Sequence, residues 1–132
     1  MNTKLLMTLS SIFLAITGIG LSFLPAEILF YVNGETSQTT IVLLQIMGAS
    51  YLGFALLNWM GKNLLMGGIY SRPVATANFM HFTVSAIVLL KFIFRVRDHL
   101  EFFLVLTILY CIFSVAFSMV LFRNPARVSN SR

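Results

Sequence analysis

Four stretches of about twenty apolar residues dominate this sequence of 132 residues. The hydrocarbon core of a bilayer is about 30 Å thick, and a helix that rises about 1.5 Å per residue needs roughly 20 residues to cross it. We therefore predict four transmembrane helices, over residues 5–24, 41–60, 74–94 and 102–122. Each must be helical, because backbone N–H and C=O groups find no water partners in lipid.

The composition argues against a soluble protein of this size. Hydrophobic residues make up 58% of the chain and charged residues 10%, and the mean hydropathy is +0.91. Soluble domains are about 45–50% apolar and about 25% charged, and a short chain leaves much of its surface in water. The predicted fold class is all-α, an integral membrane four-helix bundle with antiparallel, up-and-down helices. It forms one transmembrane domain over residues 1–132, in which 123–132 are a polar cytoplasmic tail.

The first apolar stretch, residues 5–24, has a cleaved signal peptide as its alternative interpretation. Its apolar core is longer than the 7–15 residues usual for a signal peptide, and the exit at Leu24-Pro25-Ala26 lacks a small residue at the position that cleavage needs. We therefore expect this stretch to be retained as the first span.

The basic residues are distributed unevenly between the two ends of the predicted spans. Four spans place both termini and the loop 61–73 on one side, where six Lys and Arg residues lie, against three on the other side. The six are Lys4, Lys62, Arg72, Arg123, Arg127 and Arg132, and the three are Lys91, Arg95 and Arg97. Because Lys and Arg favour the cytoplasmic side, we predict that the N- and C-termini are cytoplasmic. The net charge of +5 is scattered, so no nucleic-acid partner is expected.

Small and weakly polar residues mark the faces on which the helices are expected to pack. In lipid, helices associate through close van der Waals contact and polar side chains rather than through burial of apolar surface. In the first and fourth spans these residues recur at intervals of four, three and four residues. They are Ser11, Ala15, Gly18 and Ser22 in the first span, Gly48 and Gly53 in the second, and Thr107, Cys111, Ser114 and Ser118 in the fourth.

A polar stripe on the third span contains the candidate ligand-binding residues. Asn78, His81 and Ser85 share one helix face. Asn58 lies at a comparable depth in the second span, and Gln45 lies near the outer end of that span. An ionisable side chain inside the membrane is costly unless it faces protein or water. His81 therefore either moves protons or binds a ligand, or is a neutral histidine that donates one N–H to a neighbour, and both interpretations stay open.

The residues required for catalysis or metal binding do not occur together in the sequence. The central parts of the spans contain no acidic residue, which argues against proton-coupled multidrug exporters. Cys111 is the only cysteine, and the second histidine, His99, lies in an outer loop. The serines have no acid or base at the spacing of a catalytic triad. We therefore expect no catalytic residue, no metal and no cofactor, although a membrane enzyme remains an alternative.

The segment QIMGASYLGFALLNW at 45–59, followed by Asn78-Phe79-Met80-His81, resembles small uncharacterised bacterial four-helix membrane proteins of the DoxX-like kind. Those proteins often begin the second helix with an arginine where this chain has Gln45. The resemblance implies a four-helix inner-membrane protein and no particular activity.

Compact spans and small-residue faces favour an interaction or accessory subunit, which self-associates or binds another membrane protein and contacts membrane lipid. The alternative is a carrier, a channel or a lipid- or quinone-binding protein that uses the polar residues around His81.

Overall fold

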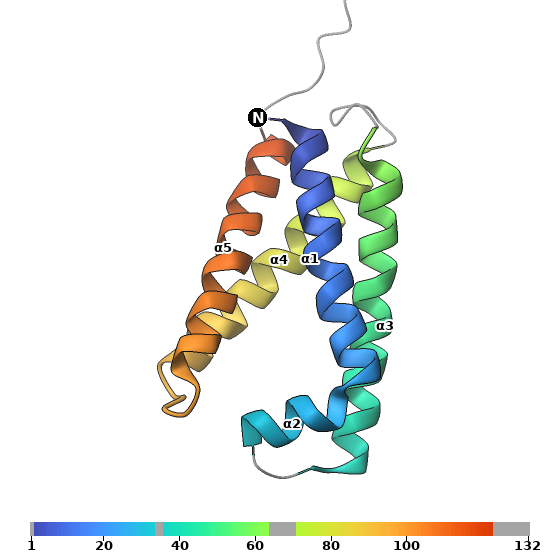
Figure 1. The fold of residues 1–132 in the computed structure, drawn as a ribbon. Coiled ribbons are helices and arrows are strands. Elements are labelled where there is room, and N and C mark those ends of the chain that lie inside the picture. The colour runs from blue at the N-terminus through green and yellow to red at the C-terminus, as the bar shows by residue number, and fades with distance from the viewer. Residues whose placement is uncertain (1, 34–35, 64–70, 123–132) are drawn as a thin grey trace, which may run out of the picture. The chain divides into compact units, whose positions relative to one another are not determined.

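The computed structural model describes residues 2–33, 36–63 and 71–122, and within them the predicted all-α fold is confirmed, because no strand occurs there. Four helices are long and apolar enough to cross a membrane (Figure 1). They are α1 (Thr3–Phe23), α3 (Gln38–Gly61), α4 (Arg72–Ile93) and α5 (Leu100–Phe122). Their ends lie within three residues of the predicted spans. The chain is a multi-pass membrane protein. The predicted tail, 123–132, and much of the predicted loop 61–73 lie outside the described residues.

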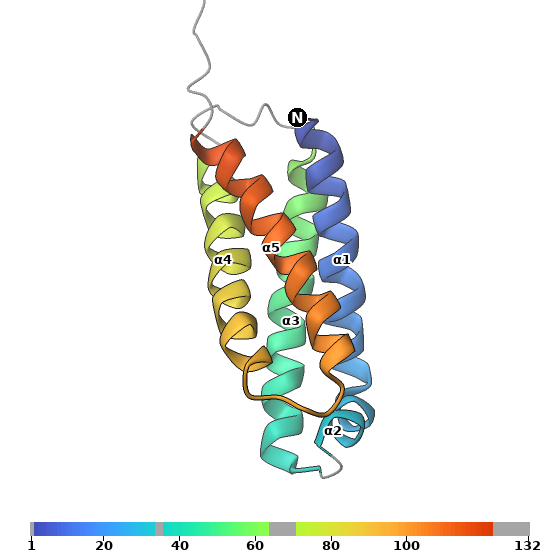
Figure 2. The same cartoon turned by 90° about the vertical axis from the view of Figure 1, so that its left-hand side faces the viewer.

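The helices group into two compact units, Asn2–Lys62 and the residues from Asn63 onward. In the first unit, α1 and α3 lie side by side and antiparallel, with the short helix α2 (Pro25–Asn33) between them in sequence (Figure 1). In the second unit, α4 and α5 form an antiparallel pair, which Figure 2 shows from another side. Each unit has its own internal contacts.

Capping residues define both ends of α1. The Asn2 side-chain oxygen accepts a hydrogen bond from the backbone N–H of Leu5 at 3.3 Å. This bond satisfies one of the donors that the first turn of a helix leaves without a partner. At the other end the chain leaves the helical conformation at Leu24, and Pro25 begins α2. Proline suits the first helical position because its φ is already fixed and its missing N–H is not needed there.

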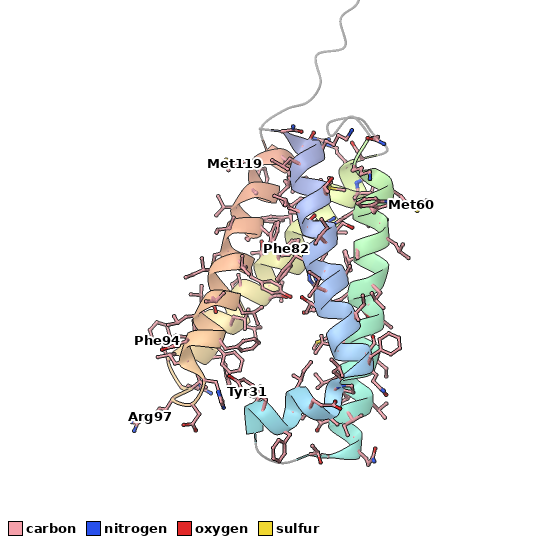
Figure 3. The ribbon with its side chains drawn as sticks, viewed as in Figure 1. Tyr31, Met60, Phe82, Phe94, Arg97 and Met119 are labelled. Carbon is pink, nitrogen blue, oxygen red and sulfur yellow. The ribbon has the colours of Figure 1, made fainter. Side chains whose placement is uncertain are left out.

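The helix α2 lies in the loop between the first two predicted spans, where a short apolar run at residues 27–32 predicts a segment at the membrane interface. Its nine residues lie crosswise to α1 and α3 (Figure 1), and a helix of about 14 Å is too short to cross a bilayer. Leu29 is buried, whereas Phe30 and Tyr31 are exposed. Tyr31 is labelled in Figure 3. The sequence Asn33-Gly34 after this run predicts a turn, which extends beyond the described residues. An interfacial position for α2 stays a prediction.

Large aliphatic side chains cover the outer faces of the long helices. Ile16, Leu56 and Ile108 are 67%, 63% and 56% exposed, and many similar side chains share this exposure. Soluble proteins rarely expose contiguous apolar surface of this extent. Acyl chains solvate such side chains without penalty, so this surface is consistent with helices that lie in lipid.

An aromatic cluster fills the contact between α4 and α5. Phe82 of α4 is fully buried and stacks on Phe113 and Phe117 of α5, with ring centroids 4.8 Å and 5.6 Å apart. Tyr110 lies 5.6 Å from the same ring. On α4, the small residue Ala86 is buried one turn from Phe82. The pair is therefore held by large rings from α5 that surround one phenylalanine of α4.

Candidate functional site

The helices α1 and α3 approach each other closely at two glycines. A Cβ atom at Gly18 would lie 3.0 Å from the carbonyl oxygen of Gly48, and one at Gly48 would lie 2.9 Å from the carbonyl oxygen of Gly18. A Cβ at Gly48 would also collide with the hydroxyl of Ser22. Near this contact, the Gln45 side-chain amide donates to the carbonyl oxygen of Ser22 at 3.4 Å. Gln45 thus bonds within the antiparallel pair of α1 and α3, which we call the hairpin.

Two further hydrogen bonds connect α1 to α3 closer to the ends that carry Lys4 and Lys62. The Ser11 hydroxyl donates to the backbone carbonyl of Ala55 at 2.7 Å. The Asn58 amide donates to the Ser10 hydroxyl at 3.0 Å, and both side chains are fully buried. Ser10 in turn donates to the carbonyl of Met7 in its own helix at 3.1 Å. Asn58 therefore has a structural hydrogen-bonding role in the first unit.

The polar residues of α4 lie within the second unit. Asn78 is fully buried, and its amide donates to the carbonyl of Val74, one turn earlier, at 2.9 Å. His81 is half-buried, and its ring centroid lies 5.2 Å from that of Phe82 and 6.0 Å from that of Tyr110. Ser85 is also half-buried. His81 is therefore part of the aromatic packing between α4 and α5.

The five predicted ligand-binding residues divide between the two units. Gln45 and Asn58 belong to the first, and Asn78, His81 and Ser85 belong to the second. The hydrogen bonds of Gln45 and Asn58 described above lie within the first unit, and that of Asn78 lies within α4. A shared ligand site around His81 stays a prediction.

The small residues of α5 lie around the aromatic cluster. Thr107 is buried and donates to the carbonyl of Phe103 at 2.7 Å, whereas Cys111, Ser114 and Ser118 are half-buried. Ser114 shares a hydrogen bond of 2.7 Å with Thr83 of α4. The small residues of α5 thus meet α4 at Ser114, and aromatic rings occupy most of the buried positions of α5.

One face of α3 points away from α1 and contains small residues. Gly53 has no atom within 4 Å of the position that a Cβ would occupy. Ala49 and Ser50, one turn away, are also exposed, and the Ser50 hydroxyl bonds only to Ile46 of its own helix among the contacts described. We call this the exposed face of α3, and it consists of Ile46, Ala49, Ser50, Gly53, Leu57 and Met60. Figure 3 shows Met60 pointing outward from the helix.

An apolar groove of about 290 Å³ lies between α1 and α3. Its lining residues are Ser11, Ala15, Leu52, Ala55, Leu56 and Trp59. Beyond its end, the ammonium nitrogen of Lys62 lies over the Trp59 ring, 3.0 Å from the ring centroid. This distance is short enough for a cation–π interaction. The groove was not identified from the sequence, although Trp59 and Lys62 at spacing i, i+3 are a local signal for their contact.

Sequence reasoning also missed Ser10 and Thr83, which complete the hydrogen bonds of Asn58 and Ser114. Ser10 is adjacent in sequence to Ser11, which lies on a predicted contact face, but the sequence does not indicate which residues oppose each other across two helices. Among the described residues, no three His, Cys, Asp or Glu side chains gather as a metal site would require.

Comparisons of the chain with protein-family models, with curated proteins and with solved structures gave no match. The resemblance to DoxX-like proteins therefore stays a prediction, and the function is argued from the helices themselves.

Proposed function

We propose that this protein is an interaction subunit of a bacterial inner membrane, which binds a transmembrane helix through the exposed face of α3. The partner helix belongs to a second copy of the chain or to another membrane protein. The observation that carries this proposal is the open position at Gly53, on the face of α3 that points away from α1.

The packing between α1 and α3 provides the physical argument. Small residues let two helix backbones approach closely, and close contact is the main source of helix association in lipid. Gly48 serves this purpose toward α1. Ala49 and Gly53 are four residues apart on the other side of α3, so they form a second small-xxx-small pattern. A helix that packed against this pattern would gain the same close contact.

The polar side chains of the long helices support an interaction role over a chemical one. Ser11 and Asn58 bond to the neighbouring helix in the hairpin, Asn78 bonds to its own helix, and Thr83 bonds to Ser114. The bonds of Ser11, Asn58 and Thr83 hold helices together, as serine, threonine and asparagine commonly do in membranes. No described group of these residues combines a nucleophile with a base and an acid.

Cysteine crosslinking in native membranes tests the proposal. Cys111 is replaced by serine, and Gly53→Cys is compared with Ile16→Cys, a lipid-exposed position on α1. We expect Gly53→Cys to crosslink and Ile16→Cys to remain uncrosslinked. Repeating the reaction in vesicles that contain this chain as their only protein distinguishes the two partners, because a crosslink that persists there joins two copies of the chain.

A second variant separates assembly from folding. Gly53→Leu adds a bulky side chain where the hairpin leaves space, so it should keep the helix content while abolishing the assembled species in native gels. Unchanged assembly in Gly53→Leu, together with no crosslink at Gly53→Cys, would overturn the proposal.

A further inference from the structure

We propose that the groove between α1 and α3 binds one acyl chain of an anionic phospholipid, whose phosphate contacts Lys62. The groove and the lysine are independent of the exposed face of α3, so this site does not depend on the proposed function.

The lining of the groove fits a hydrocarbon chain. Ala15, Leu52, Ala55 and Leu56 contribute only apolar side chains. The hydroxyl of Ser11 is already donated to the carbonyl of Ala55, so it does not demand a polar partner from the groove. Leu56 and Trp59 are 63% and 48% exposed, and they form the side from which a chain can enter.

The size and depth of the groove match part of a lipid tail. The volume of 290 Å³ is roughly ten times the volume of about 30 Å³ that a water molecule occupies in the liquid, which leaves room for roughly ten groups of methylene size. From Lys62 to Leu52 the helix rises about 15 Å, half of the hydrocarbon thickness of about 30 Å. The groove itself is lined by α3 from Leu52 to Trp59, a rise of about 10 Å, so it occupies most of one leaflet, with Lys62 beyond its surface end.

The position of Lys62 suits a phosphate. The Trp59 ring holds the ammonium group at 3.0 Å from its centroid, and an ammonium group has three N–H donors to offer to oxygen atoms. Because α1 and α3 are antiparallel, Lys4 lies at the same end of the unit. The acid described in this unit, Glu27, lies in α2 at the opposite end. An anionic headgroup is therefore attracted to this end of the hairpin.

The predicted orientation places this end in the cytoplasmic leaflet, where anionic lipids attract basic residues. Each lysine near such a surface contributes about 1 kcal/mol, which corresponds to a preference of about fivefold for an anionic over a zwitterionic headgroup. Phosphatidylglycerol and phosphatidylcholine with identical acyl chains are therefore the appropriate probes.

Trp59 reports directly on the groove, because it is the only tryptophan of the chain. The full-length protein is reconstituted in phosphatidylcholine vesicles that contain a fixed mole fraction of lipid with brominated acyl chains. Bromine quenches tryptophan fluorescence at short range. We expect brominated phosphatidylglycerol to quench Trp59 with an apparent affinity about fivefold higher than that of brominated phosphatidylcholine.

Two pairs of variants locate the lipid. Lys62→Gln should abolish the preference of about fivefold for phosphatidylglycerol over phosphatidylcholine. Lys91→Gln, the same change at the end of α4, should leave this preference intact. Ala15→Leu fills the groove and should lower quenching by both brominated lipids, whereas Ala49→Leu on the exposed face of α3 should not. The fluorescence of each variant in brominated lipid is divided by its fluorescence in unbrominated lipid. A change in Trp59 fluorescence caused by loss of the Lys62–Trp59 contact therefore cancels.

Equal quenching by the two brominated lipids in the wild-type protein would overturn the proposal, because it would show only unselective contact with bulk lipid. Unchanged quenching in a folded Ala15→Leu protein would overturn the placement of the chain in the groove. If Ala15→Leu does not fold, the comparison of the two brominated lipids in the wild-type protein and in the surface variant Lys62→Gln still tests the lipid site. Ala49→Leu alters only the exposed face of α3. If that face does not bind a partner helix, the lipid result at the groove is unaffected.

Discussion

Gly18 and Gly48 lie against each other so closely that a methyl group at either position would press on the opposite backbone. The Cβ of an alanine would lie 3.0 Å from the carbonyl of Gly48 in one case and 2.9 Å from the carbonyl of Gly18 in the other. Because these neighbours are backbone atoms, they cannot move aside as a side chain would. The separation of α1 and α3 is therefore set by the absence of side chains at two positions.

Gly48→Ala should destabilise the first unit by about 1–3 kcal/mol, the usual cost of overpacking. Gly53→Ala is the matched control, since a Cβ there meets no atom within 4 Å. This control should be neutral or slightly stabilising, because alanine is the better helix former. Unfolding in detergent, followed by circular dichroism, measures both. Equal losses in the two variants would contradict the close contact.

Ser11→Ala removes the hydrogen bond to the carbonyl of Ala55. Hydrogen bonds between helices in membranes contribute about 0.6 kcal/mol on average and about 1.7 kcal/mol at most, so a loss in this range is expected in the same unfolding assay. Ser50→Ala deletes the same atom from a hydroxyl whose described bond is to its own helix. A larger loss for Ser50→Ala than for Ser11→Ala would show that the hairpin is not held as described.

Phe82→Ala should cost about 3 kcal/mol, because it leaves a cavity among Phe113, Phe117 and Tyr110. Phe94, in the turn after α4, is 88% exposed (Figure 3). Phe94→Ala should change stability by less than about 0.5 kcal/mol. Thermal unfolding of the two proteins in the same detergent compares them, and similar midpoints would argue against a packed aromatic core.

Labelling of single cysteines with a membrane-impermeant maleimide checks the orientation predicted from the basic residues. In a Cys111→Ser background, Arg97→Cys in the turn before α5 should react in intact cells, because this turn is predicted to lie outside. Asn63→Cys, just after α3, should react only after the membrane is opened. The reverse pattern would place the termini outside, and labelling of both from one side would contradict an odd number of crossings between them.

The positions of the four long helices could be predicted because lipid requires a minimum length of apolar helix. That length can be counted directly along the sequence. The helix α2 was not predicted as a helix, because nine residues at an interface satisfy no such length requirement. The contact faces were only partly predictable. In lipid the outer face of a helix is apolar too, so hydrophobic periodicity does not distinguish the inner face from the outer one.

The rule that small residues mark contacts performed differently in the two units. It identified Gly18 and Gly48, which meet across α1 and α3. On α5 it identified Ser114, but the most buried positions include Tyr110 and Phe117, since large rings also fill the space between helices. The register between two helices, on which the pairing of Ser10 with Asn58 depends, requires the folded structure.

The hydrogen bonds of Asn58 and Ser11 inside the first hairpin also bear on how the chain enters the membrane during synthesis. A buried asparagine without a partner is costly in hydrocarbon, and the partner of Asn58 is supplied by the helix made before it. The insertion machinery would then release α1 and α3 into lipid more readily as a pair than singly. Replacing Ser10 and Ser11 by leucine should lower the inserted fraction of α3, although α1 itself becomes more hydrophobic. The hairpin would thus be a self-sufficient intermediate of biogenesis, complete before the ribosome has translated α4.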